Sequence, residues 1–162
     1  MRTRQHVCNT QKLLEDFLSK RHGIPLHASE HTGVFHSPTE KLASIGMQVR
    51  HRLTSHGFAV NVTNEPLAWF DRVIACGLEG VQAASVQSAG VKDAASLNRE
   101  ASPSVPEEMG VLAEMFGEKY SKDIRSLEDH GPKEIVEEVM KLEVIAEGLG
   151  DWPKEPLTGG TS

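Results

Sequence analysis

The sequence predicts an α+β fold, a mixed β-sheet flanked by helices, and two observations support this prediction. Apolar residues recur at helical spacing in three segments, roughly residues 5–21, 106–120 and 132–149. Between the first two helical segments, residues 41–50 and 53–62 form apolar runs with partial alternation, which is typical of strands. We therefore expect a sheet that helices cover.

Composition limits the function classes that the chain can belong to. The chain has 162 residues, 38% hydrophobic and 25% charged, which suits one domain with a real core. No apolar run approaches the roughly 18 residues of a membrane span, so we expect no membrane protein. A net charge of −6 and a pI near 5.7, without a basic patch, argue against nucleic acid as a partner.

Cysteine usage and the first residues bear on the compartment. Cys8 and Cys76 are too few for a disulfide framework, so we expect free thiols in a reducing compartment. The basic first residues contain neither a secretory apolar core nor a long transit segment, so no targeting segment is visible.

The first helix, residues 5–21, is expected to end at Gly23, and a turn-rich segment with a short extended piece at residues 33–36 follows it. Four histidines fall in or next to this segment. Their spacing matches no structural zinc pattern and no cysteine pair accompanies them, so we expect solvated loop histidines and no metal site. These histidines are His22, His27, His31 and His36.

Two strands are expected to form a hairpin around His51 and Arg52. In the first strand, residues 41–50, Ala43, Ile45, Met47 and Val49 share one face, whereas Ser44 and Gly46 lie on the other. Gly46 indicates a bulge or a close approach of backbone or ligand. The hairpin would bring Ser44-Ile45-Gly46 near Gly57-Phe58-Ala59, where small residues could line a slot.

Cys76 follows a short helical turn predicted from Leu67 onward and precedes Gly77. The residues alone leave two interpretations open. A lone cysteine is more often a small core hydrophobe, but it can also be a nucleophile.

The remaining segments are predicted as support. Residues 82–103, rich in Ala and Ser, are expected to be a mobile surface insertion. Ser104 is a candidate cap for the helix at 106–120, which is expected to pack on the sheet. The helix at 132–149 is apolar around too much of its circumference for one stripe, so it packs back or engages a partner. Residues 148–162 are predicted to be a disordered tail.

Three segments, KLASIG, TSHGFAVNV and WFDRVIACGLEGV, resemble the C-terminal half of the lipoyl(octanoyl) transferases in order, spacing and chemistry. These enzymes are also called octanoyl-[acyl-carrier-protein]:protein N-octanoyltransferases. The similarity begins near Arg4, includes Thr32-Gly33-Val34, runs to Glu79 and returns in SVPEEMGVLAEMFGEKYS. The resemblance implies a biotin/lipoate protein ligase-like fold.

The sequence also departs from the family. The Arg-Gly-Gly and Thr-Tyr-His-Gly-Pro-Gly-Gln segments that precede this region in the family are absent, and Ala75 replaces a frequent proline. The resemblance therefore implies a fold incomplete at the N-terminus, with residues 1–147 as a partial octanoyltransferase catalytic domain that contains the insertion.

The resemblance also implies roles for single residues. Cys76 matches the acyl-accepting nucleophile, and Lys41 matches the lysine that lowers the pKa of the thiol and takes part in proton transfer. Pairing Cys76 with Lys41 has a physical reason, because a nearby cation favours the thiolate form of a cysteine. The expected substrate-binding residues are Ser44, Ile45, Gly46, His56, Gly57, Phe58, Ala59 and Asn61.

The implied reaction moves an octanoyl group from octanoyl-acyl-carrier protein to the lipoyl-domain lysine of 2-oxoacid dehydrogenases or the glycine cleavage H protein, without a cofactor. One alternative is a catalytically inactive fragment that acts as a binding or regulatory module. A second is an ATP-dependent lipoate or biotin ligase, which ranks last because no phosphate-binding glycine loop is present. The resemblance implies mitochondria in a eukaryote and cytoplasm in a bacterium.

Overall fold

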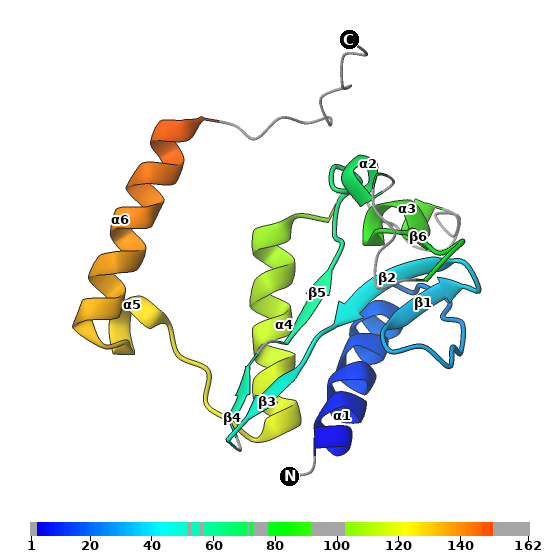
Figure 1. Ribbon diagram of the computed structural model, residues 1–162, viewed down its shortest axis with the longest axis horizontal. Helices are drawn as coiled ribbons and strands as arrows, with labels where there is room; N and C mark the ends of the chain where they lie inside the picture. Colours follow the sequence, from blue (N-terminus) through cyan, green and yellow to red (C-terminus); the bar gives the residue numbers. More distant parts are fainter. Residues whose placement is uncertain are drawn as a thin grey trace.

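The computed structural model describes residues 3–51, 53–55, 57–70, 72, 78–91 and 103–150 (Figure 1). Helices and strands both contribute, so the α+β prediction is confirmed. The elements are α1 (Thr3–Asp16), the π-helix η1 (Phe17–Arg21), β1 (Val34–Ser37), β2 (Glu40–Ile45), β3 (Gln48–Arg50), β4 (Leu53–Ser55), β5 (Phe58–Val60), α2 (Leu67–Phe70), β6 (Gln82–Ala83), α3 (Val86–Val91), α4 (Val105–Tyr120), α5 (Leu127–His130) and α6 (Lys133–Leu149).

β2 is the central strand of the main sheet. β1 pairs with it antiparallel along one edge. The other edge is shared, because β5 pairs antiparallel with the end of β2 and β6 pairs parallel with its start. The sheet is therefore mixed, as predicted.

The strand expected at residues 41–50 is divided into β2 and β3. β3 pairs with β4 in a separate two-stranded hairpin that turns at His51, and all three residues of β3 are exposed. Val49 thus has no core to face, and the predicted buried face ends at Ile45. The hairpin turn itself agrees with the prediction.

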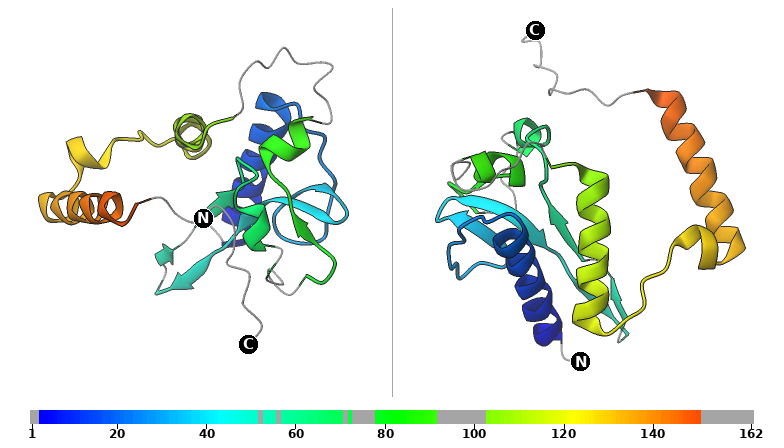
Figure 2. Two further views of the ribbon diagram at one scale, coloured as in Figure 1. Left: turned by 90° about the horizontal axis from the view of Figure 1, so that it is seen from above. Right: turned by 180° about the vertical axis from the view of Figure 1, so that it is seen from behind.

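The core lies between the sheet and the helices α1 and α4, which run side by side against it (Figure 2). Leu42 and Ala43 are both buried although successive side chains of a strand point to opposite faces. β2 is therefore covered on both faces, whereas the sequence pattern identified only the face of Ala43. The buried apolar residues are Leu13, Leu14, Phe17, Leu18, Ile24, Val34, Phe35, Leu42, Ala43, Val62, Ala84, Val86, Ala89 and Leu112.

Residues 82–91 differ from the expected mobile surface insertion, because they form β6 and α3 and contribute buried side chains. Ser85 caps α3: its Oγ accepts from the Ser88 backbone N–H at 2.9 Å, and Ser88 Oγ accepts from the Ser85 backbone N–H at 3.0 Å. This reciprocal pair is a capping box with serine in place of the usual glutamate. Residues 92–102 of the expected insertion lie outside the described residues.

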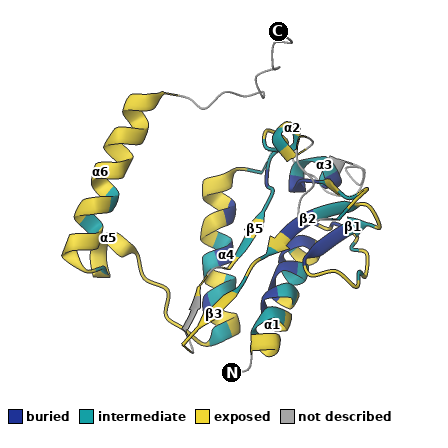
Figure 3. Cartoon of the chain, viewed as in Figure 1, coloured by how far each residue is buried: buried dark blue, intermediate teal, exposed yellow. Residues whose placement is uncertain are grey.

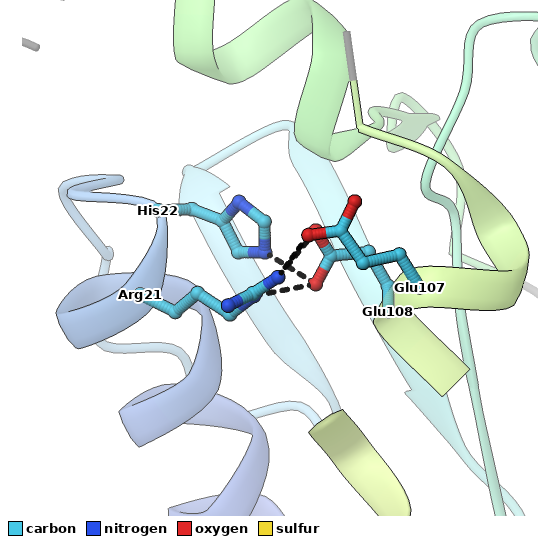
Figure 4. Close-up of polar contacts among 4 residues, drawn as sticks. All are labelled: Arg21, His22, Glu107 and Glu108. Atoms are coloured by element: carbon cyan, nitrogen blue, oxygen red, sulfur yellow. Dashed lines mark hydrogen bonds and ion pairs between the residues drawn. The ribbon is translucent and has the colours of Figure 1, made fainter. Parts of the chain in front are cut away.

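A buried polar cluster joins η1 to α4 (Figure 4). Arg21 donates from Nε to Glu108 Oε2 at 2.7 Å and from an Nη2 hydrogen to Glu107 Oε1 at 2.8 Å. His22 Nε2 lies 3.3 Å from Glu108 Oε2. The hydrogen bond to Glu108 is the main cause that raises the pKa of Arg21. His22 is 1% exposed, so the expectation of a solvated loop histidine is wrong for this residue.

α5 and α6 contain no buried residues, and α6 stands apart from the rest of the described chain (Figure 3). The helix predicted at 132–149 is confirmed, but it does not pack back on the domain. Its apolar residues are largely exposed, among them Leu142, Val144 and Leu149. Of the predicted tail, residues 151–162 lie outside the described residues.

Replacing either of two glycines of α4 with alanine is expected to change the free energy of unfolding, in opposite directions for the two positions. A Cβ on Gly110 would meet no atom within 4 Å, so Gly110→Ala should raise the free energy of unfolding by about 0.5–1 kcal/mol through helix propensity. A Cβ on Gly117 would lie 2.8 Å from the Lys122 carbonyl oxygen and 2.9 Å from Ile124 Cγ1. Gly117→Ala should therefore destabilise the chain in urea denaturation, and equal effects of the two variants would contradict this packing.

Candidate functional site

A pocket of about 210 Å³ lies where β2, β5, α2 and the segment around β6 meet. Four of the residues that the sequence singled out line it, together with four that it did not. The described residues that line it are Lys41, Ser44, Ala59, Asn61, Phe70, Val81, Gln82 and Ala83.

Strand register brings the first of these residues together. Ser44 pairs with Ala59 across β2 and β5, so their side chains lie on the same face of the sheet. Asn61 continues this face: its backbone N–H donates to the Leu42 carbonyl at 3.2 Å, and its side-chain Nδ2 donates to the Ala84 carbonyl at 3.1 Å. Asn61 therefore ties the end of β5 to the residues that follow β6.

Lys41 is held between two neighbouring strands. It pairs with Phe35 of β1 and with Ala83 of β6, and its Nζ lies 5.4 Å from the centroid of the Phe35 ring. Gly33 lies against the lysine stem, since a Cβ on Gly33 would be 2.5 Å from Lys41 Cε. A side chain at position 33 would thus occupy the space that the stem uses.

The expected proximity of residues 44–46 and 57–59 is confirmed. Ile45 pairs with Phe58, and the Gly46 N–H donates to the Gly57 carbonyl at 3.0 Å. Ile45 and Phe58, however, pack against the hydrophobic core, on the opposite face from Ser44 and Ala59. They support the pocket from behind and are not among its described lining residues.

Two of the predicted site residues, Cys76 and His56, lie outside the described residues. The predicted dyad of Cys76 and Lys41 therefore stays a prediction. The other cysteine, Cys8, is exposed on α1.

Sequence reasoning missed Phe70, Val81, Gln82 and Ala83. Phe70 lay in the predicted helical turn but was assigned no role, and residues 82 and 83 fell in the expected insertion. Val81 and Ala83 alternate with polar Gln82, a short pattern that could have indicated a strand.

The walls of this pocket suit a ligand with an apolar body and a polar head. Phe70, Val81 and the alanines offer apolar surface, whereas Lys41, Ser44 and Asn61 offer a cation, a hydroxyl and an amide. Among the described residues no group of three or more His, Cys, Asp or Glu side chains is placed to hold a metal ion. No helix in the described ranges is both long and apolar enough to cross a membrane.

Comparison with curated proteins finds octanoyltransferases. A zebrafish (Danio rerio) protein named octanoyl-[acyl-carrier-protein]:protein N-octanoyltransferase LIPT2, mitochondrial, is 30% identical over 120 residues, which is 73% of this chain and 47% of that protein. A probable octanoyltransferase of Schizosaccharomyces pombe is 38% identical over 65 residues, 40% of this chain and 29% of that protein. An octanoyltransferase of Frankia casuarinae is 37% identical over 100 residues, 61% of this chain and 42% of that protein.

This chain spans less than half the length of each of these three relatives. No protein-family model matches it.

Proposed function

We propose that this chain, a homologue of part of the octanoyltransferases, transfers an octanoyl group from octanoyl-acyl-carrier protein to a lysine of a lipoyl domain. In this proposal Cys76 is the nucleophile, Lys41 is its cationic partner, and the fold is that of the biotin/lipoate protein ligases. The donor is the one that the name of the zebrafish relative contains.

One observation supports the proposal most. Four residues chosen from the sequence come from β2, from β5 and from the position after β5, and they line the same pocket: Lys41, Ser44, Ala59 and Asn61. Its apolar walls suit a hydrocarbon chain, for which burial is favourable by about 0.8 kcal/mol per methylene.

Residues on both sides of Cys76 in the sequence line this pocket. Phe70 lines it on the N-terminal side, and on the C-terminal side the Val81 N–H donates to the Leu78 carbonyl at 3.4 Å. Cys76 lies between Phe70 and Val81 in the sequence. An acyl group on Cys76 is therefore proposed to enter the pocket.

The proposed chemistry has two steps. The Cys76 thiolate attacks the thioester carbonyl and a new S–C bond forms; the C–S bond to the carrier protein breaks, and the carrier thiolate leaves and takes up a proton to become a thiol. The amine of the acceptor lysine then attacks octanoyl-Cys76; the C–N bond forms, the C–S bond breaks, and the amine proton returns to the Cys76 sulfur. Lys41 favours the thiolate by its charge and takes part in the proton transfer.

Partners and location are proposed from the same homology. The acceptors would be the lipoyl domains of 2-oxoacid dehydrogenases and the glycine cleavage H protein. Because the names of the relatives from zebrafish and Kluyveromyces lactis include a mitochondrial location, mitochondria are proposed for a eukaryotic source.

Intact mass spectrometry after mixing with octanoyl-acyl-carrier protein tests the proposal. We expect an octanoyl adduct that hydroxylamine removes, present in the wild type and absent in Cys76→Ala. Cys8 is exposed and could accept the acyl group without specificity, so Cys8→Ser is the matched control and should keep the adduct. No adduct on a folded chain would refute nucleophilic transfer and favour the alternative of a binding or regulatory module.

The role of Lys41 is tested separately. Lys41→Ala should slow iodoacetamide labelling of Cys76 at neutral pH several-fold, because the thiolate loses a neighbouring cation. Labelling of the exposed Cys8, measured on its own peptide in the same sample, is the internal reference. If labelling slows equally at both cysteines, or slows at neither, the result contradicts the proposed dyad of Cys76 and Lys41.

The ATP-dependent ligase remains the weakest alternative. Free octanoate with ATP should give no octanoylated lipoyl domain, and product formation under these conditions would replace the transferase proposal.

A further inference from the structure

Phe70 has the largest apolar side chain among the described residues that line the pocket, and we propose that its ring sets the length of the acyl chain that the pocket accepts. This inference rests on the proposed function, because it assigns a specificity-determining residue to the same site.

Phe70 differs from most of the other described lining residues because its side chain is both large and apolar. Half of the described lining residues are polar, and Ala59 and Ala83 are small, so Phe70 and Val81 supply the large apolar surfaces. Phe70 is 38% exposed although it is aromatic. An apolar ligand in the pocket would cover part of this ring, and this burial would favour binding.

The volume of the pocket can be converted into an approximate number of acyl-chain carbons. A cavity of about 150 Å³ accommodates benzene, which has six carbons, so one carbon needs about 25 Å³. On this scale the 210 Å³ of the pocket hold about eight carbons. The volume of the pocket is therefore of the order that an octanoyl chain needs.

The other walls are less able to adjust. Ser44 and Ala59 belong to the paired strands β2 and β5, Ala83 belongs to β6, and the Asn61 amide is bonded to the Ala84 carbonyl. Phe70 ends the four-residue helix α2, which packs beside β6. Removing its ring would free the space that the ring occupies beside the pocket without breaking a strand.

The experiment measures the dissociation constants of hexanoate, octanoate, decanoate and dodecanoate for the full chain by isothermal titration calorimetry. The wild type should bind octanoate at least as tightly as decanoate. In Phe70→Ala the two extra methylenes of decanoate become buried, and at about fourfold per methylene the preference should move toward decanoate by about 15-fold. Phe70→Trp should move it toward hexanoate.

Leu67→Ala is the control for damage to α2, since Leu67 lies on the same helix and is not among the described lining residues. It should leave the chain-length preference within about twofold of the wild type. Circular dichroism of each variant establishes that the fold is kept, and the opposite shift in Phe70→Trp serves as the second test if Phe70→Ala does not fold.

The outcomes separate this inference from the proposed function. An unchanged preference in both Phe70 variants, or no binding of any of the four acids to the wild type, would overturn the inference. Acylation of Cys76 is read independently by mass spectrometry. A shifted chain-length preference without any acyl-Cys76 would support Phe70 as the length-setting residue and refute acyl transfer. Acylation of Cys76 with an unshifted preference would support acyl transfer and refute the role of Phe70.

Discussion

Replacing Glu108 with alanine is expected to lower the free energy of unfolding by about 3 kcal/mol, because it removes the shared partner of a buried polar cluster. Glu108 is 1% exposed, and its carboxylate accepts from Arg21 and lies next to the ring nitrogen of His22. Without it, the imidazole and the guanidinium face a cavity at the join between η1 and α4. In a thermal melt the loss corresponds to about 6–12 °C.

Glu107 is the matched control, because it bonds the same Arg21 at a similar distance but is largely exposed. Glu107→Ala should cost at most about 1 kcal/mol, as surface ion pairs do. Glu108→Gln, which keeps the shape and one acceptor oxygen, should fall between the two. If the two alanine variants have equal small effects, the cluster does not hold α4 in place.

A double-mutant cycle with Arg21→Ala separates the pair from its surroundings. We expect a coupling energy of about 2 kcal/mol between Arg21 and Glu108, within the range for residues of one polar network. A coupling near zero would mean that the cost of Glu108→Ala arises from cavity formation alone.

This cluster illustrates what the sequence could not predict. Glutamates in the first turn of a helix usually face solvent, where the helix dipole favours them, so nothing local marks Glu108 as buried. Its partner lies 87 residues earlier in the chain. Contacts of this kind depend on how η1 and α4 meet in the fold, and hydrophobic periodicity carries no information about that.

The elements themselves were predictable because their patterns are local. Apolar spacing located α1, α4 and α6, and the small residues around Gly46 and Gly57 located the paired ends of β2 and β5. β6 and α3 were missed because the composition of residues 82–91 suggested a surface insertion. The parallel pairing of β6 with β2 is a tertiary feature, whereas the Ser85–Ser88 capping box of α3 is a local signal that the sequence analysis did not use.

The residues of the candidate site also divide into those that the sequence could predict and those that it could not. Lys41, Ser44, Ala59 and Asn61 were identified by their motifs and line one pocket, but the motifs also placed Ile45 and Phe58 among the substrate-binding residues, although both pack against the core. That distinction depends on strand register, because neighbouring residues of a strand point to opposite faces. Phe70 and Val81 come from segments without a clear period, so only the structure identifies them as lining residues.

Replacing Gly33 with alanine is expected to destabilise the chain by about 3 kcal/mol and to displace the Lys41 side chain. Gly33 has a φ of +131°, where any residue with a Cβ is strained. Its Cβ would also lie 2.7 Å from the Ala43 carbonyl oxygen and 2.5 Å from Lys41 Cε. Gly46→Ala is the matched control: a Cβ there meets nothing within 4 Å and the φ of Gly46 is not positive, so the stability should change by less than about 1 kcal/mol.

The same substitution in a Lys41→Ala background distinguishes the two sources of strain. Alanine at position 41 removes Cε and Nζ, but it leaves the positive φ and the contact with the Ala43 carbonyl oxygen unchanged. Because the lysine end is flexible and the backbone is not, we expect most of the loss, about 2 kcal/mol or more, to persist in urea denaturation. Full relief by Lys41→Ala would instead mean that the lysine stem is held rigidly, and that Gly33 is needed to leave room for it.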